Sequence, residues 1–366
     1  MTKTNPKTIE EIVIDANIEK YEILPAPADL IRAIPLTEKV RETVLRGRKQ
    51  IKDILDKKDS RKIVIVGPCS IHDTAAGLEY ANNLEKLAAE VSDVLLIVMR
   101  TYLEKPRSTI GWKGLIYDPN LDNSGDIRKG ILIGRQFLLD VSNKGVYCAN
   151  EFVREDFPQY IADLISWAAI GARTVESQTH RELSSGLSMP VGFKNNTSGD
   201  IKVAVDACLA SKHEHGFPGL TIDGKICIVR TKGNNYCHIV LRGGNGMSNY
   251  HPEKVQEAIK LIKRAGLQVN IIIDCSHANC NKIYERQEEA SYEVLRQINE
   301  GNENIVGIML ESNLNEGRQD FPKNHEEISK LAYGTSITDP CISWETTEKI
   351  IRKYSEVLRE MNRRRH

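Results

Sequence analysis

Four residues of types that bind transition metals stand at or beyond the ends of short apolar segments: Cys69, His277, Glu311 and Asp339. A thiolate, an imidazole and two carboxylates suit a divalent transition metal such as Mn, Fe, Co or Zn. A hard-cation site would not need the thiol, and a structural zinc site does not normally use two carboxylates. Taken alone, Cys69 is better explained as an inert buried thiol, since free cysteine is among the most buried residue types. The shared position after apolar segments is what favours a metal site.

Six basic residues form a second group, because each one ends or closely follows an apolar segment. A charge in such a position is costly to bury unless it has a partner. Phosphate is the partner that the set favours, since arginine forks bind phosphate oxygens bidentately and lysine supplies a point charge. A metal beside two anion sites suggests condensation of two phosphorylated substrates, with the metal polarising a carbonyl group. The six residues are Arg100, Lys105, Arg107, Arg173, Lys194 and Arg242.

Short apolar strands that alternate with helical stretches must position both groups. Eight such strands predict an α/β protein, a (β/α)8 TIM barrel, with an open doubly wound sheet as the alternative. The carboxyl ends of barrel strands converge on one mouth, so the two groups of residues would meet there. The predicted strands are 63–66, 94–99, 146–152, 172–176, 191–194, 238–241, 270–274 and 305–310. The predicted helices are 37–57, 75–91, 127–141, 158–170, 181–187, 201–211, 253–265, 283–300 and one from 345 to near the C-terminus.

The stretch 218–237 breaks this alternation, because Asp223-Gly224 is typical of a hairpin turn and a strand-like run follows it. We expect an inserted β-hairpin at about 218–237. Residues 1–36 are polar with scattered apolar positions, which indicates an extension that docks on another surface. We therefore divide the chain into an N-terminal extension and helix, 1–60, that makes oligomer or effector contacts, and a catalytic barrel, 61–366.

Composition excludes several classes of protein. The chain has 366 residues, of which 50 are Lys or Arg and 50 are Asp or Glu, so no net field favours nucleic acid or a membrane as a partner. The polar start lacks the apolar core of a secretory signal, and no apolar run reaches the roughly 18–20 residues needed to span a bilayer. The eight cysteines form no short-loop framework. Reduced thiols and a cytoplasmic location are the expectation.

Six stretches in order closely resemble the type I 3-deoxy-D-arabino-heptulosonate-7-phosphate (DAHP) synthases: GPCSIHD, MRTYLEKPRSTIGWKGL, GARTVESQTHRELSSGLSMPVGFKN, HIVLRGG, DCSHAN and SITDPCISWE. The likeness runs from about residue 30 to the C-terminus. It implies a metal-dependent transferase that condenses phosphoenolpyruvate with erythrose 4-phosphate, as the first step toward chorismate and the aromatic amino acids. It also implies a barrel with an N-terminal extension and an inserted hairpin.

The resemblance implies a role for each matched residue. Cys69, His277, Glu311 and Asp339 would bind the metal, and Arg173, Lys194 and Arg242 would bind the phosphate of phosphoenolpyruvate. Arg100 and Lys105 would lie on its carboxylate and between the substrates, while Arg107, Ser108 and Thr109 would bind the sugar phosphate. Glu151 would help to position the attacking water. The new alkoxide would take its proton from Lys105 or from a water on the metal. His277 and Asp339 count as catalytic as well as metal-binding in this reading.

Three positions depart from the usual family motifs. Ser108 stands where threonine is common, Asn196 where glycine is common, and Val175 where a hydroxyl-bearing residue is common. Asn is the least unfavourable replacement if the glycine needs a positive φ. We expect Ser108 to retain function because it keeps a hydroxyl group.

The resemblance also implies regulation and assembly. Members of the family are commonly homotetramers built from dimers and inhibited by an aromatic amino acid, here phenylalanine or tyrosine. Five residues match the effector pocket by position: Pro158, Gln159, Leu187, Ser188 and Phe217. Ordinary packing explains the five equally well. The rival functions are 3-deoxy-octulosonate 8-phosphate synthase, which would use arabinose 5-phosphate, and an inactive regulatory barrel.

Overall fold

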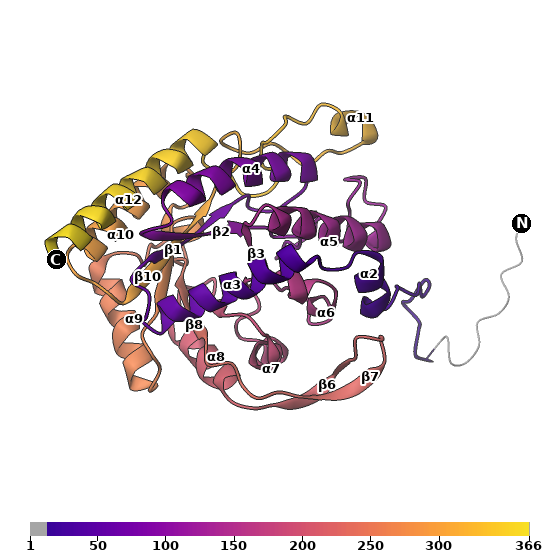
Figure 1. Cartoon of the computed structure of the whole chain (residues 1–366). Helices are drawn as coiled ribbons and strands as arrows, with labels where there is room; N and C mark the ends of the chain where they lie inside the picture. The colour runs from indigo at the N-terminus through magenta and orange to yellow at the C-terminus, as the bar shows by residue number, and fades with distance from the viewer. Residues whose placement is uncertain (1–12, 366) are drawn as a thin grey trace, which may run out of the picture.

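Eight short parallel strands close into a barrel in the computed structural model, which describes residues 13–365 (Figure 1). Their order around the barrel is β1-β10-β9-β8-β5-β4-β3-β2, so β1 and β10 complete the closure. The predicted (β/α)8 barrel is therefore confirmed, and the open doubly wound sheet is excluded. The strands are β1 (Lys62–Gly67), β2 (Leu95–Arg100), β3 (Tyr147–Glu151), β4 (Trp167–Ile170), β5 (Val191–Lys194), β8 (Cys237–Leu241), β9 (Ile271–Asp274) and β10 (Ile305–Glu311).

Helices surround the barrel, and their local sequences explain where several of them begin. The Asp73 carboxylate accepts hydrogen bonds from the backbone N–H groups of Ala75 and Ala76 at the start of α4, and Thr37 caps α3 in the same way. The helices are α2 (Pro27–Ala33), α3 (Glu38–Leu55), α4 (Thr74–Glu90), α5 (Ile127–Asn143), α6 (Pro158–Ile161), α7 (Gln178–Gly186), α8 (Lys202–Lys212), α9 (Pro252–Arg264), α10 (Arg286–Asn299), α11 (His325–Ile328) and α12 (Trp344–Arg365), with 3-10 turns at η1 (Ala162–Leu164) and η2 (His277–Asn279).

The fourth strand lies earlier than predicted. The sequence predicts a helix over 158–170 and a strand over 172–176, but the helix ends at Ile161 and the strand is Trp167–Ile170. The small residues Ala168 and Ala169 favour helix locally, whereas pairing with β3 and β5 forces an extended conformation. Gly171 follows the last residue of this strand and lies against Glu151. A Cβ atom at this position would lie 2.0 Å from Glu151 Oε1, so a larger residue would displace the glutamate.

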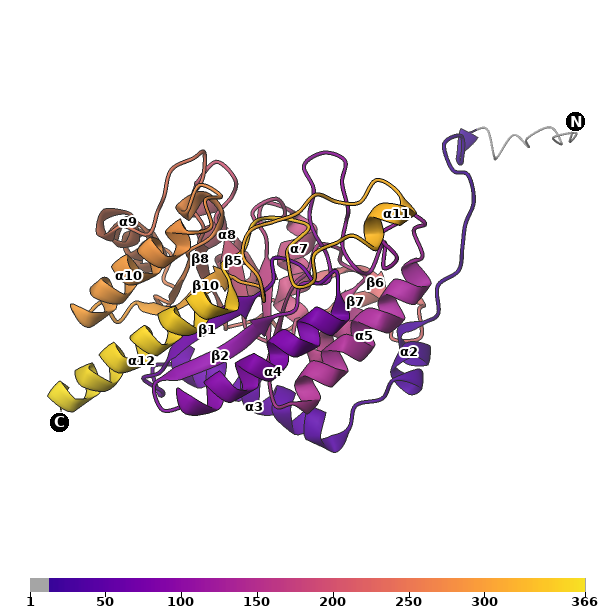
Figure 2. The same ribbon diagram turned by 90° about the horizontal axis from the view of Figure 1, so that it is seen from above.

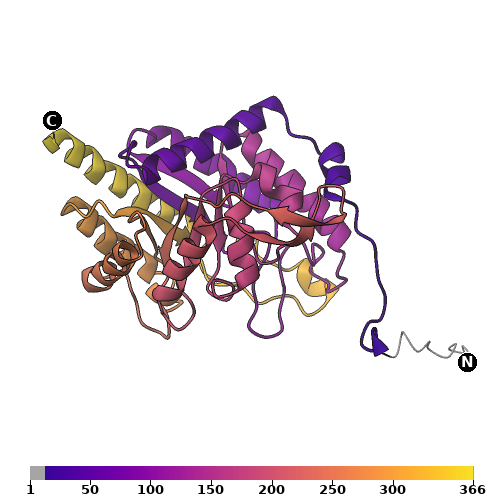
Figure 3. The same ribbon diagram turned by 90° about the horizontal axis from the view of Figure 1, so that it is seen from below.

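The inserted hairpin is shorter than predicted and contacts the N-terminal segment. It consists of β6 (Gly216–Leu220) and β7 (Ile226–Arg230), while Cys237 already belongs to β8. The backbone N–H of Ala28 in α2 donates a hydrogen bond to the Ile222 carbonyl oxygen at the hairpin tip. Figures 1 and 3 show α2 beside this tip. Helix α2 itself was not predicted. Residues 13–24 run away from the barrel (Figure 2), and residues 1–12 of the predicted extension lie outside the described residues.

Alternating side chains of the strands fill the barrel interior. Ile63 and Ile65 of β1 point inward, whereas Val64 and Val66 pack against the helices. Toward the amino ends of the strands, the fully buried Trp167 indole N–H donates to His238 Nε2 at 3.0 Å. Burial lowers the pKa of His238 from 6.5 to about 4, so this imidazole is neutral at pH 7. The filled interior makes the opposite end of the barrel the place for a site.

No helix within residues 13–365 is both long enough and apolar enough to cross a membrane.

Replacing His238 with glutamine should weaken the acid sensitivity of the fold. The folded-state pKa of His238 lies below its ordinary value of 6.5, so the unfolded chain binds more protons between pH 6.5 and 4. Stability should therefore fall as the pH drops through this window, by on the order of 1–2 kcal/mol by pH 5. A glutamine can keep both the Trp167 and the Tyr236 contacts without titrating.

Urea unfolding at pH 7 and pH 5 would measure this effect. The exposed His213 supplies the matched control, and His213→Gln should leave the pH dependence as in the wild type. Equal losses of stability in the wild type and His238→Gln would contradict the assignment of the effect to His238.

Candidate active site

The structure brings the four predicted metal ligands together at the carboxyl ends of the strands. The parallel register pairs Gly67 of β1 with Glu311 of β10, which places Cys69 beside this glutamate. Ligand atoms of Cys69, Glu311 and Asp339 all lie within 4.8 Å of one another. The Nε2 atom of His277 lies 3.5 Å from Glu311 Oε1 and so faces the same group. Strands that are distant in the sequence thus supply one cluster of donors.

His277 adopts a conformation that few residues with a side chain adopt. Its φ is +57°, in the left-handed region, at the start of the short turn η2 after β9. Its Nδ1 atom lies 2.7 Å from Ser276 Oγ and 2.9 Å from Asp274 Oδ2. This backbone conformation and these contacts turn Nε2 toward the other three ligands.

Lys105 is the cation that lies closest to this cluster. Its Nζ atom is 2.9 Å from both Cys69 Sγ and Asp339 Oδ2. Burial would lower the pKa of Lys105 and raise that of Asp339, but the opposite charges prevail, so the pKa of Lys105 is raised and that of Asp339 is lowered. Burial raises the pKa of the Cys69 thiol to about 11, so in this structure the thiol is protonated.

A divalent transition metal fits this donor set. The cluster combines a soft sulfur with an imidazole and two carboxylates, and the carboxylates already attract a cation in the form of Lys105. A bound metal would also favour the thiolate form of Cys69, since coordination deprotonates a thiol. The donors do not select one metal among Mn, Fe, Co and Zn.

Five of the six predicted cations line one pocket beside the metal cluster. Arg100 is paired with Glu311 at 3.0 Å and Lys194 with Asp274 at 3.0 Å, and both side chains are almost fully buried. The buried Nε of Arg242 has no hydrogen-bond partner among the described residues, and burial lowers the pKa of this arginine. An orphaned donor on a cation is what an anion site requires. The predicted residues that line the pocket are Cys69, Arg100, Lys105, Glu151, Arg173, Lys194, Arg242, His277 and Glu311.

The residues predicted to bind the sugar phosphate lie outside this buried pocket. Arg107, Ser108 and Thr109 are exposed on the loop that follows β2. Ser108 still reaches the rim of the pocket, because its Oγ accepts a hydrogen bond of 2.8 Å from Arg173 Nε. Gly114 allows the loop to fold back, since its φ is +117° and a Cβ there would lie 2.3 Å from the Leu103 carbonyl oxygen. The structure therefore brings Arg173 and Ser108 together and leaves Thr109 at the surface.

The three departures from the family motifs have different surroundings. Ser108 uses its hydroxyl group in the contact with Arg173. Asn196 does not adopt a positive φ, and its side chain instead binds Glu176 and the backbone N–H of Asp200. Val175 is fully buried in the hydrophobic core. The explanation that asparagine replaces a glycine with a positive φ is therefore wrong for Asn196. The hydrogen bonds of its side chain explain an asparagine at this position.

Sequence reasoning missed two residues of the pocket, Tyr102 and Glu104. The Arg100 guanidinium lies 4.0 Å from the centre of the Tyr102 ring, a cation–π contact inside the protein. Glu104 accepts hydrogen bonds from Tyr117 Oη and the Val153 backbone N–H, and burial raises its pKa to about 8. The alternation of residues after β2 could have placed Tyr102 inside the barrel. No local signal indicates that an acid next to Lys105 is buried.

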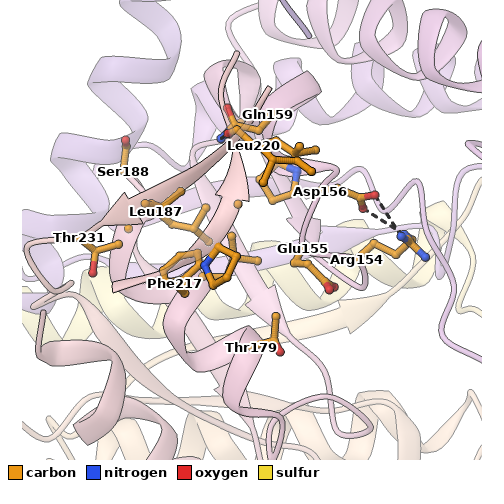
Figure 4. A pocket seen from close by; sticks show the side chains of 18 residues that line it. Arg154, Glu155, Asp156, Gln159, Thr179, Leu187, Ser188, Phe217, Leu220 and Thr231 are labelled. Atoms are coloured by element: carbon orange, nitrogen blue, oxygen red, sulfur yellow. Dashed lines mark hydrogen bonds and ion pairs between the residues drawn. The ribbon is translucent and has the colours of Figure 1, made fainter. Parts of the chain in front are cut away.

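A second pocket lies away from the barrel mouth, beneath the inserted hairpin (Figure 4). It has a volume of about 500 Å³, and its walls come from the hairpin, from α6 and α7 and from the loop after β3. Arg154 and Asp156 form an ion pair at 3.0 Å on this loop. All five residues predicted for an effector site line this pocket, namely Pro158, Gln159, Leu187, Ser188 and Phe217.

Comparisons with known proteins agree on one family. The model of the DAHP synthetase I family matches residues 34–352. The chain is 46% identical to the Tyr-sensitive phospho-2-dehydro-3-deoxyheptonate aldolase of Escherichia coli K12, over 94% of this chain and 96% of that protein. It is 48% identical to the Phe-sensitive enzyme of the same organism, over 94% and 97%. The solved phospho-2-dehydro-3-deoxyheptonate aldolase of Francisella tularensis superposes with a TM-score of 0.90 at 45% identity, covering 94% of this chain and 99% of that one.

Replacing Glu104 with glutamine should stabilise the protein at alkaline pH. The folded-state pKa of about 8 lies above the ordinary 4.5, so between these values the folded chain holds the proton and the unfolded chain does not. The stability that comes from this group is therefore lost as the pH rises toward 8. Between pH 6 and pH 8.5 the wild type should therefore lose on the order of 1–3 kcal/mol of stability that Glu104→Gln does not lose, so the variant gains on the wild type over this range.

Thermal or urea unfolding at the two pH values would check this. The exposed Glu214 provides the control, because Glu214→Gln removes a carboxylate that is already solvated. Equal losses of stability between pH 6 and pH 8.5 in the wild type and Glu104→Gln would show that burial does not hold this proton.

Proposed function

We infer that the residues at the barrel mouth carry out the reaction of the DAHP synthetase I family, to which this chain belongs. The chain is an enzyme, a DAHP synthase of the type that an aromatic amino acid inhibits. It condenses phosphoenolpyruvate with erythrose 4-phosphate and water, releasing phosphate, in the first step of the shikimate pathway. The observation that carries the assignment of the site is the meeting of five cations and three of the four predicted metal ligands in one pocket, with the fourth, Asp339, within 4.8 Å of the Cys69 and Glu311 ligand atoms.

Each substrate presents charges that match the pocket. The phosphate of phosphoenolpyruvate would lie among Arg173, Lys194 and Arg242, where the orphaned Arg242 Nε supplies a free donor. Its carboxylate would face Arg100 and Lys105. The phosphate of erythrose 4-phosphate would bind at the rim, where Arg107, Ser108 and Thr109 face solvent. The arrangement would hold the enol carbon of one substrate close to the aldehyde of the other.

The bonds that change define what the protein groups must do. Carbon 3 of phosphoenolpyruvate attacks the aldehyde carbon, and a water adds to carbon 2, after which the bond between carbon 2 and the phosphate oxygen breaks. Glu151 lines the pocket and would orient that water, and Lys105 would give a proton to the new alkoxide. A metal held by Cys69, His277, Glu311 and Asp339 would supply Lewis-acid polarisation of the aldehyde oxygen.

Two rival functions are less well supported. An inactive regulatory barrel would be expected to have lost ligands, but all four metal-binding side chains and all five pocket cations are present and face one another. 3-Deoxy-octulosonate 8-phosphate synthase would use arabinose 5-phosphate, and the relatives reported above are phospho-2-dehydro-3-deoxyheptonate aldolases at 46% and 48% identity.

The second pocket is our candidate for the effector site. Its apolar wall, which includes Leu187 and Phe217, suits an aromatic ring, and the Arg154–Asp156 pair at its rim could bind the carboxylate and ammonium groups of an amino acid (Figure 4). The two Escherichia coli relatives carry the names Tyr-sensitive and Phe-sensitive, so either amino acid is a candidate here.

A short loop would connect the effector site with the chemistry. Residues 152–157 begin directly after Glu151 of the active-site pocket and include Arg154 and Asp156 of the second pocket. Val153 anchors this loop, since its N–H donates to Glu104 and its carbonyl lies 2.8 Å from His180 Nε2 of α7. Movement of the loop on effector binding would therefore disturb Glu104 and Glu151.

Assembly and location are further parts of the proposal. Apolar side chains that are largely exposed, including Ile23 at 87%, Ile226 at 86% and Ile228 at 72%, gather on the N-terminal segment and the hairpin. Such side chains favour burial against other copies of the chain, consistent with a homotetramer built from dimers. We place the reaction in the cytoplasm, where the free cysteines would stay reduced.

Phosphate release from phosphoenolpyruvate should require both a metal and erythrose 4-phosphate. The test strips the protein with EDTA, resupplies Mn²⁺, and offers erythrose 4-phosphate or arabinose 5-phosphate as the second substrate. A preference for the pentose would reassign the enzyme to the sister reaction. No release with either sugar, from folded and metal-loaded protein, would leave only the regulatory-barrel hypothesis.

Two thiol variants make the same assay specific for the site. Cys69→Ser should lower the rate by at least about 100-fold, because it removes a proposed metal ligand. Cys148→Ser changes an equally buried thiol on β3 that lies outside the pocket, and it should retain a rate within about twofold of the wild type.

Replacing Phe217 with alanine should relieve inhibition without slowing the uninhibited enzyme. Loss of the ring removes apolar contact with an aromatic effector, which should raise the half-inhibitory concentration of tyrosine or phenylalanine by about 10-fold or more. Leu209→Ala, a partly exposed apolar residue on α8 outside the pocket, is the control and should be inhibited like the wild type. Unchanged inhibition of Phe217→Ala would place the effector site elsewhere.

A further inference from the structure

One buried carboxylate touches both halves of the active site. Asp274, the last residue of β9, is fully buried. Its Oδ2 atom lies 2.9 Å from Nδ1 of the metal-binding His277 and 3.0 Å from Nζ of the phosphate-binding Lys194. Sequence reasoning assigned no role to Asp274. A single oxygen atom thus joins a residue of the metal cluster to a residue of the anion pocket.

The other oxygen of Asp274 is held firmly. Oδ1 accepts hydrogen bonds from the backbone N–H of Ser276 at 3.0 Å and from its hydroxyl at 2.5 Å. Oδ2, in contrast, accepts no well-angled hydrogen bond among the described residues, although two nitrogen atoms lie close to it. Oδ2 is therefore shared between His277 and Lys194 and is bonded well to neither. An oxygen in this position can bond one donor better when the other turns away.

We propose that Asp274 is a positioning residue that couples metal binding to the binding of phosphoenolpyruvate, so that each makes the other tighter. The inference rests on the proposed function and adds the link between its two subsites. It concerns Asp274 acting through His277 and Lys194, and it assigns no contact between Asp274 and a substrate.

The direction of the coupling follows from competition for Oδ2. Without substrate, the ammonium of Lys194 draws on the negative charge of Asp274. A bound phosphate would attract Lys194, and more of the Asp274 charge would then act on the His277 Nδ1–H. A carboxylate that accepts from the outer nitrogen of a ligand histidine fixes its tautomer and strengthens the other nitrogen as a ligand. By linkage, the metal must tighten substrate binding by the same factor.

The experiment measures the affinity for Mn²⁺ with and without phosphoenolpyruvate, using the electron paramagnetic resonance signal of free Mn²⁺. Erythrose 4-phosphate is omitted, so no turnover occurs. Asp274→Asn keeps the shape but removes the charge, and it should weaken Mn²⁺ binding by roughly 10–100-fold. In the wild type, phosphoenolpyruvate should lower the Mn²⁺ dissociation constant by about 10-fold or more, and in Asp274→Asn by less than about threefold.

Glu176→Gln is the matched control. It removes a carboxylate that binds Asn196, two residues from Lys194, but that contacts neither His277 nor Lys194 in the described structure. Direct electrostatic attraction between the metal and the phosphate would persist in both variants. The difference in coupling between the two variants therefore measures the contribution of Asp274. Wild-type coupling in a folded Asp274→Asn protein would overturn the proposal, as would an equal loss of coupling in Glu176→Gln.

Two further measurements keep the test decisive. In metal-free protein labelled with ¹⁵N-histidine, nuclear magnetic resonance should report the Nδ1–H tautomer of His277 in the wild type and a shift toward Nε2–H in Asp274→Asn, because the amide offers a donor instead of an acceptor. An unchanged tautomer would count against the proposal. If Asp274→Asn does not fold, Ser276→Ala, which removes the hydroxyl held between Asp274 Oδ1 and His277 Nδ1, should show an intermediate loss of coupling, and full coupling there would contradict the proposal.

The phosphate-release assay separates this inference from the function on which it rests. A wild-type protein that releases no phosphate with either sugar would refute the proposed function. A wild-type enzyme that turns over, together with an Asp274→Asn variant that keeps full coupling, would refute only the role of Asp274.

Discussion

Charges buried at the mouth of a barrel are tolerated only when each one has a partner, and this constraint shapes the whole site. Desolvation of an isolated ion costs several kcal/mol or more. Arg100 is accordingly paired with Glu311 and Lys194 with Asp274, and Lys105 contacts Cys69 and Asp339, two of the predicted metal ligands. The pairs hold the side chains in place before any ligand arrives, so the site pays little to reorganise when substrates bind. Arg242 Nε has no hydrogen-bond partner among the described residues, and we propose that a phosphate of the substrate accepts from it.

The barrel supplies the rigidity that this arrangement needs. Parallel pairing of β1 with β10 aligns Gly67 with Glu311, so the position of Cys69 depends on closure of the sheet. Trp167 and His238 fill the interior nearer the amino ends of the strands. The candidate active site lies at the carboxyl ends, where the loops after β2, β9 and β10 can vary without disturbing the core.

The hairpin and the N-terminal segment lie outside the barrel. The hairpin forms one wall of a pocket with mixed apolar and charged walls outside the mouth, and a hydrogen bond from the Ala28 N–H joins α2 to the hairpin tip. The loop at 152–157 links the two regions, because it runs from Glu151 of the active-site pocket to the walls of the second pocket. A site placed there can influence the reaction without sharing groups with the substrates, so the two functions can change independently.

The sequence by itself determined the barrel and the family, and it named most of the side chains that the structure brings together in the candidate site. Runs of β-branched residues such as 63–66, each followed by a polar motif, are local signals that need no tertiary information. Local signals failed for Trp167–Ile170, whose alanines resemble a helix until the neighbouring strands pair with them. Only the tertiary structure decided which charges share a partner, that Glu104 is buried, and that Asp274 touches both His277 and Lys194. These contacts depend on the register of strands far apart in the chain, because a periodic pattern indicates which way a side chain points but not what it meets.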